Sequence, residues 1–160
     1  MQSRLDVQKA SPAALHAMYG LETFLRKSSK LEPSLLELVK MRASQINGCA
    51  YCIDMHSKDA RAEGETEQRL YALNAWRETP FFTDREQAAL AWTEALTLVH
   101  EGHVPDAVYE EARRRFSEEE LVNLAMAVVA INGWNRLMVA FRGVPGEYQP
   151  AARKAEEAKQ

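Results

Sequence analysis

The chain has 160 residues, with 20 basic and 23 acidic side chains, and a formal net charge of −3. Hydrophobic residues make up 46% and charged residues 27%, which is typical of a globular domain and excludes a largely disordered chain. The charge balance argues against nucleic acid or anionic lipid as a partner. Two cysteines are too few for a disulfide-rich secreted scaffold or a four-cysteine zinc site. The length predicts one domain, residues 1–160.

Composition also predicts the fold class. Ala, Glu and Leu together account for 58 residues, whereas Val, Ile and Thr account for 19. Strong helix formers therefore outnumber β-branched residues about threefold, which favours an all-α domain.

Proline, glycine and capping signals divide the chain into about seven helices. The first is predicted over residues 12–27, with Ser11 as N-cap and Pro12 at the first helical position. The second runs from about residue 33 to 47 and stops at Asn47-Gly48. A third begins at or just after Gly48 and ends near residue 63. The remaining helices are expected at 66–76, 83–99, 105–115 and 117–141, with capping boxes at Thr83-Glu86 and Ser117-Glu120. The tail from Gln149 is predicted as a frayed helix or disorder.

The sequence shows neither a predicted targeting signal nor a predicted membrane span, and the cytoplasm is therefore the expected compartment. The longest apolar run, residues 124–131, is far shorter than the roughly 18 residues of a membrane span. No apolar segment follows the charged N-terminal residues, so no signal peptide is predicted. In that compartment a cysteine pair is more often catalytic or metal-binding than structural.

Both cysteines lie in one short segment, Asn47-Gly48-Cys49-Ala50-Tyr51-Cys52-Ile53-Asp54-Met55-His56. On a helix, Cys49, Cys52 and His56 share one face. The helix N-terminus, which carries about half a positive charge, favours a thiolate at Cys49. The imidazole of His56, one turn after Cys52, favours a thiolate there instead. Spacing alone does not decide between the two sulfurs.

Several chemistries compete for this segment. A redox-active dithiol is favoured because a Cys-x-x-Cys pair at a helix start has reactive thiolates. Zinc would need a fourth ligand beyond Cys49, Cys52 and His56, supplied by the distant His100 or His103. A c-type haem is excluded because Ile53, not histidine, follows the second cysteine. A thioredoxin fold is disfavoured because no strand precedes the pair. Two inert buried cysteines remain the plain alternative.

Glu37 has two interpretations. It falls within an apolar helical segment, where a carboxylate usually belongs to a solvated face. The functional interpretation makes it a buried group that orients His56. On sequence alone the first is favoured.

Glu37, Arg42-Ala43-Ser44, Cys49-Ala50-Tyr51-Cys52 and His56 together resemble the alkyl hydroperoxidase AhpD core of the carboxymuconolactone decarboxylase family. The resemblance rests on the spacing: twelve positions from Glu37 to Cys49, three to Cys52 and four to His56. It implies a single-domain helical fold with the Cys-x-x-Cys pair at the N-terminus of a central helix.

The resemblance also implies a peroxidase cycle. Cys52 is expected to attack the hydroperoxide, Cys49 to form a disulfide with it, and His56 to act as base with Glu37 orienting the ring. A lipoyl-type or thioredoxin-like dithiol protein would then reduce the disulfide. No cofactor and no metal is expected, and the chain is expected to form a homo-oligomer, a trimer or hexamer.

One position departs from the family pattern. The best-known AhpD-type relay has a histidine where this chain has Tyr51, and a phenol with a pKa of about 10 is a poor base at neutral pH. Two alternatives therefore stay open. One is a non-redox decarboxylase-type enzyme with Arg42 as a cationic anchor. The other is a helical oligomeric protein whose cysteines sense redox state or bind zinc.

Overall fold

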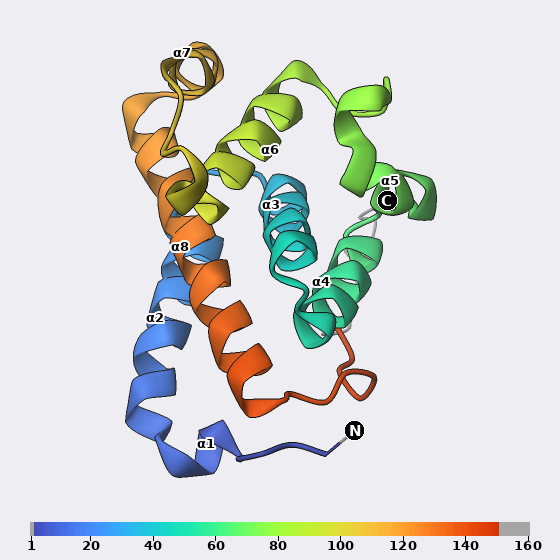
Figure 1. Cartoon of the computed structure of the whole chain (residues 1–160), viewed down its shortest axis with the longest axis vertical. Coiled ribbons are helices and arrows are strands. Elements are labelled where there is room, and N and C mark those ends of the chain that lie inside the picture. The colour runs from blue at the N-terminus through green and yellow to red at the C-terminus, as the bar shows by residue number, and fades with distance from the viewer. Residues whose placement is uncertain (1, 151–160) are drawn as a thin grey trace, which may run out of the picture.

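The computed structural model describes residues 2–150, and all regular structure within them is helical (Figure 1). The prediction of an all-α fold is therefore confirmed. The described elements are α1 (Val7–Ala10), α2 (Pro12–Ser28), α3 (Pro33–Asn47), α4 (Ala50–Ala62), α5 (Glu67–Ala72), η1 (Leu73–Glu78), α6 (Asp84–Thr97), η2 (Val99–Glu101), α7 (Asp106–Arg115) and α8 (Glu118–Phe141).

Helix α3 lies at the centre and packs against α4, α6 and α8 (Figure 1). Leu38, Val39 and Ala43 of α3 have no exposed surface. Helix α2 packs along α8, and α7 packs on α6. A residue on α3 can therefore meet side chains from either side of the bundle, and this central placement positions the site described below.

The link between α3 and α4 is a tight turn at Gly48. This residue adopts a left-handed conformation with φ of 65°, and its N–H bonds to the carbonyl oxygens of Ser44 and Gln45. A residue without a β-carbon adopts this conformation at little cost, so glycine is the favoured residue at a helix C-terminus. The turn lets α4 begin two residues later, with Cys49 as its N-cap.

Asparagines fasten the end of α3 to α8 beside this turn. The side-chain amide of Asn47 donates to Asn132 at 3.0 Å and to Asn135 at 2.8 Å. Asn135 donates in turn to the hydroxyl of Ser44 at 3.0 Å. Buried polar side chains that are fully paired in this way specify one register between two helices. They fix α8 against the start of α4.

Most predicted elements are confirmed, including both capping boxes, at Thr83 and Ser117. Ser11 precedes α2 as predicted, but its side chain forms no capping hydrogen bond. A short α1, capped by Asp6, was not predicted. The predicted tail falls almost wholly outside the described residues, since only 149 and 150 belong to them.

The helix predicted over 66–76 is wrong in part. An α-helix ends at Ala72 and a 3₁₀ helix follows, with Ala75 at φ −121° and ψ 33°. The buried side chains of Leu73 and Trp76 are three residues apart, and the three-residue turn of a 3₁₀ helix places both on the same side. The tryptophan also donates to Glu94 on α6 at 2.9 Å. Tertiary contacts therefore override the helical propensity here.

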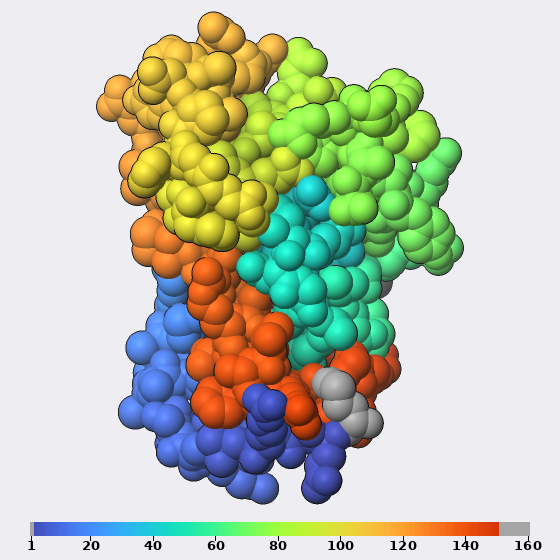
Figure 2. Space-filling model, in the orientation of Figure 1, coloured from blue at the N-terminus to red at the C-terminus, as the bar shows by residue number. Residues whose placement is uncertain are grey.

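Helix α8 is long and apolar enough, by length and composition, to cross a membrane. The apolar run at residues 124–131, taken alone, was too short to predict a membrane span. In the structure it is a core helix whose buried side chains include Leu124, Ala127 and Ile131. Its outer side is accessible along much of its length, next to α2 (Figure 2). Val122 and Val129 of α8 are exposed, and homo-oligomer formation stays a prediction.

We expect Gly48→Ala to lower the free energy of unfolding by about 1 kcal/mol or more, because alanine resists the left-handed conformation. Gly20→Ala is the matched control. Gly20 lies inside α2 with nothing within 4 Å of an added β-carbon, so alanine should be neutral or stabilise by up to about 1 kcal/mol. Urea titration of both variants measures the difference. Equal stability of the two variants would contradict this account of the turn.

Candidate active site

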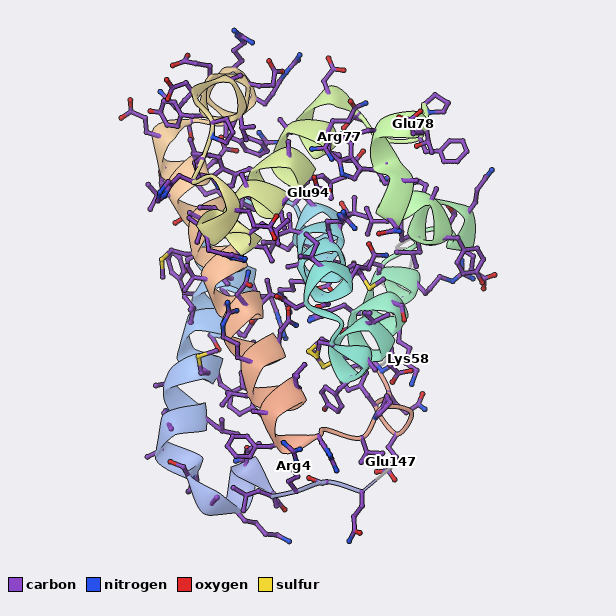
Figure 3. The ribbon with its side chains drawn as sticks, in the orientation of Figure 1. Arg4, Lys58, Arg77, Glu78, Glu94 and Glu147 are labelled. Atoms are coloured by element: carbon purple, nitrogen blue, oxygen red, sulfur yellow. A yellow bond between two sulfur atoms is a disulfide. The ribbon has the colours of Figure 1, made fainter. Side chains whose placement is uncertain are left out.

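The two cysteines lie at the start of α4, facing α8, and a disulfide joins them (Figure 3). Their Cα atoms are 5.4 Å apart. Each residue is 1% exposed, and both pack with Ala43 and Ile131 in one apolar cluster. Tyr51, Trp134 and Met138 are partly buried and pack against this cluster. The two sulfurs are thus close enough to form a disulfide, and the surrounding side chains shield them from solvent.

Cys49 is the N-cap of α4, and its Sγ accepts a hydrogen bond from the backbone N–H of Cys52 at 3.4 Å. A sulfur at this position receives the positive end of the helix dipole. The expectation that α4 begins just after Gly48 is confirmed. The dipole therefore acts chiefly on Cys49.

Glu37 and His56 form the second part of the site. His56 is 4% exposed, and its Nδ1 donates to Oε2 of Glu37 at 2.8 Å. Cys52, His56 and Ala60 form the buried face of α4, as the predicted spacing requires for the first two. Because a carboxylate only accepts, Nδ1 carries the hydrogen and Nε2 is left as the basic nitrogen. In the described residues no hydrogen bond joins the His56 ring to either sulfur.

The carboxyl of Glu37 belongs to the interior and not to a solvated face, which was the interpretation favoured on sequence alone. Its side chain is 14% exposed. Burial raises its pKa, but the hydrogen bond and charge of His56, together with Lys40, outweigh that effect and leave the pKa below its usual range. Glu37 is therefore ionised at neutral pH and can hold an imidazolium.

Tyr51 lies between the cysteines with its ring packed on their cluster. Burial raises its pKa, and Tyr19 and Asp54 raise it further. Its hydroxyl forms no hydrogen bond to any residue between 2 and 150. A phenol in this setting stays protonated at neutral pH and cannot act as a base.

Arg42, predicted as a supporting residue, lies in a different network. Its Nε donates to Glu94 at 2.7 Å, and Nη1 donates to Asn74 at 2.8 Å. Arg77 also pairs with Glu94, and Figure 3 shows these last two side chains pointing toward each other. The guanidinium of Arg42 thus links α3 to α6 and is not brought to the cysteines.

Sequence reasoning missed four residues around Glu37, namely Glu22, Lys40, Asp59 and Tyr148. Lys40 Nζ is 3.6 Å from Oε1 of Glu37. With Asp59 and Tyr148 it lines a cavity of about 190 Å³ beside Glu37. Lys40 follows Glu37 by three positions and Asp59 follows His56 by three, so helical spacing could have found both. Tyr148 comes from a distant segment and left no such signal.

One group in the described residues has donor atoms placed as a metal site would need. Oxygen or nitrogen atoms of Glu37, His56 and Asp59 lie within 4.8 Å of one another. Within this group Glu37 already pairs with the ammonium of Lys40 and with His56, and Asp59 accepts a hydrogen bond from Tyr148. The zinc set of both cysteines and His56 with His100 or His103 is not assembled within residues 2–150. His100 is exposed and pairs with Glu101.

Comparisons with known proteins identify the family of the chain. The model of the carboxymuconolactone decarboxylase family matches residues 12–95. Uncharacterized protein YdfG of Bacillus subtilis is 42% identical over 140 residues, which cover 88% of this chain and 95% of that protein.

Two solved structures have the same fold. Protein ATU0492 of Agrobacterium tumefaciens has a TM-score of 0.88 and 43% identity, covering 92% of this chain and all (100%) of that one. The debrominase Bmp8 has a TM-score of 0.78 at 22% identity, covering 88% of this chain and 75% of that one, and shows the fold alone. The chain described here belongs to the carboxymuconolactone decarboxylase family and has its AhpD-like helical fold.

Proposed function

We propose that this protein is a thiol-dependent peroxidase that reduces hydroperoxides with the Cys49–Cys52 pair. The observation that carries the proposal is a cysteine pair able to form a disulfide, followed after one helical turn by a buried His56–Glu37 hydrogen bond. The similar Agrobacterium protein is described as a proposed antioxidant defence protein, AhpD. The debrominase Bmp8 has the same fold, so the fold alone does not fix the substrate.

The first step is attack of the Cys52 thiolate on the terminal oxygen of a hydroperoxide. His56 takes the thiol proton at Nε2, and Glu37 stabilises the resulting imidazolium. The O–O bond breaks, the sulfur gains an oxygen as a sulfenic acid, and the imidazolium returns the proton to the departing alkoxide. An alcohol leaves, and the two electrons come from the sulfur.

The second step closes the disulfide. The Cys49 sulfur attacks the sulfenic acid of Cys52, an S–S bond forms and water leaves. The Cα separation of 5.4 Å is within the range that a disulfide needs, so no backbone rearrangement is required. A dithiol protein, lipoyl-type or thioredoxin-like, then restores both thiols by exchange. We place this cycle in the cytoplasm, where such reductants are kept reduced.

One observation and one experiment bear on the alternatives. The decarboxylase alternative needs a free cation near the site, and Arg42 is instead committed to Glu94. The zinc alternative needs reduced cysteines with His56 and a further histidine, and metal analysis of the purified protein tests it directly. We expect no stoichiometric zinc, because a structural zinc site needs four ligands.

Peroxide treatment of fully reduced protein tests the central claim. Wild type should lose about two mass units as the disulfide closes, whereas Cys49→Ser should gain one or more oxygen atoms on Cys52. Intact-mass spectrometry with peptide mapping measures both changes. Cys52→Ser is the matched variant, and its remaining thiol should react far more slowly. If Cys52 stays reduced in wild type and in Cys49→Ser, the peroxidase proposal is wrong.

His56→Ala should slow peroxide oxidation of the reduced pair by roughly 10²–10⁴-fold, because the proton acceptor is removed. Stopped-flow measurement of disulfide formation at neutral pH gives the rate. His16→Ala is the control, since His16 lies exposed on α2. An unchanged rate in His56→Ala would remove this residue from the mechanism.

Tyr51→Phe should change the oxidation rate by less than about threefold, since the hydroxyl forms no hydrogen bond among the described residues and is too weak a base. The variant keeps the ring that packs against the cysteine cluster. The same stopped-flow assay measures it. A loss of a hundredfold or so would instead place the phenol in the proton relay.

A further inference from the structure

A buried series of charged side chains lies behind Glu37, and the reaction above does not use it. Lys40 is on α3, one turn after Glu37, and its side chain is only 9% exposed. Its Nζ is 2.9 Å from Oε2 of Glu22 and 3.6 Å from Oε1 of Glu37. The other oxygen of Glu22 accepts a hydrogen bond from Nε1 of Trp134 at 3.1 Å. Lysine is almost never this buried unless it is paired, so the arrangement needs a reason.

The two oxygens of Glu37 are divided between two partners. Oε2 accepts the hydrogen bond from His56, while Oε1 faces the ammonium of Lys40. Burial would favour the neutral acid, and a neighbouring positive charge favours the carboxylate. The pKa of Lys40 is itself lowered by burial, yet Glu37 and Glu22 raise it more, so its charge persists. Each charge in the series stabilises the next.

Net charge explains what the series does for His56. With neutral His56, the three groups Glu22, Lys40 and Glu37 sum to one negative charge. When His56 takes a proton, the buried group becomes neutral, which favours that transfer in a site of low dielectric. Without Lys40 the two carboxylates would leave two negative charges, which raises the pKa of Glu37 and favours its neutral form. A neutral Glu37 no longer supports an imidazolium.

Other charged groups face Glu37 from the neighbouring elements. Asp59 on α4 is acidic and cannot balance the negative charge of Glu37. It accepts a hydrogen bond from Tyr148 of the C-terminal segment at 2.7 Å. Arg26 on α2 and Glu63 after α4 line the same cavity. Within residues 2–150, Lys40 is the only lysine or arginine that forms an ion pair with Glu37. The role of counter-charge therefore falls to it.

We propose that Lys40 is a positioning residue that holds Glu37 as a carboxylate, so that His56 can take the proton of the Cys52 thiol. Glu22 fixes the ammonium in place. The proposal rests on the function proposed above, because it concerns the same proton transfer. It assigns the buried lysine a task in the reaction as well as in packing.

The test compares Lys40→Met with Lys40→Arg and with Lys30→Met. Lys40→Met keeps the length of the side chain and removes its charge, whereas arginine restores the charge. Lys30 is the control, because it also pairs with a glutamate, Glu119, but on the exposed surface. Two quantities are measured between about pH 5 and pH 9: the rate of peroxide-driven disulfide formation, and the thiolate fraction from its ultraviolet absorbance.

In Lys40→Met the pKa of Glu37 should rise, and Glu37 should then support the His56 imidazolium less well. The Cys52 thiolate should therefore form at higher pH, and the rising limb of the rate profile, which reports that thiolate, should move up by about one pH unit or more, with a loss of about tenfold at neutral pH. Lys40→Arg should return the limb to its wild-type position, and Lys30→Met should not move it. Packing alone would lower stability without shifting the limb. Coincident profiles of Lys40→Met and wild type would overturn the proposal.

Two further comparisons keep the test decisive. Should Lys40→Met alone fail to fold, the double variant Glu37→Gln with Lys40→Met, which removes both charges of this ion pair, is compared with Glu37→Gln. The added Lys40→Met should then change the rate by less than about twofold. A further tenfold loss would overturn the proposal. Should wild type not react with peroxide, the proposed function falls, and the thiolate titration then decides on Lys40. A thiolate titration curve that moves to higher pH in Lys40→Met and returns in Lys40→Arg supports the role of Lys40. Superimposed curves of Lys40→Met and wild type refute it.

Discussion

The structure around the cysteines depends on keeping one carboxylate ionised inside a helical bundle. Glu37 lies on the central helix, with its side chain largely withdrawn from water. Desolvation alone would raise its pKa, so the carboxylate needs partners that favour its charged form. His56 comes from α4 and Lys40 from the next turn of α3, while Glu22 on α2 holds the lysine. The packing of α3 at the centre makes these meetings possible.

The sequence predicted those parts of this arrangement that follow from local rules. Gly48 ends one helix and Cys49 begins the next because backbone capping depends on neighbouring residues only. The capping boxes at Thr83 and Ser117 form for the same reason. The shared face of Cys52 and His56 follows from helix geometry. Local signals thus located the site along the chain, and the spacing of Glu37 connected it to a family.

The parts that were not predicted depend on contacts between distant segments. The chain after Ala72 becomes a 3₁₀ helix because Trp76 reaches Glu94 on α6. The positive charge of Arg42 would suit a substrate anchor, yet its guanidinium donates a hydrogen bond to Glu94. Tyr148 meets Asp59 only because the C-terminal segment crosses α4, where Lys58 binds its backbone. A single sequence cannot show which of several acidic partners a buried cation will meet.

Access to the sulfurs and the charge of the site are linked through one side chain. Trp134 packs against the cluster that contains both cysteines, and its Nε1 donates to Glu22, the partner of Lys40. Glu22 is buried enough that losing this donor would leave a lone pair without a partner, at a cost of about 1–3 kcal/mol. The same tryptophan therefore joins the apolar cluster of the cysteines to the charge series behind Glu37, so a substitution at Trp134 would alter the surroundings of both.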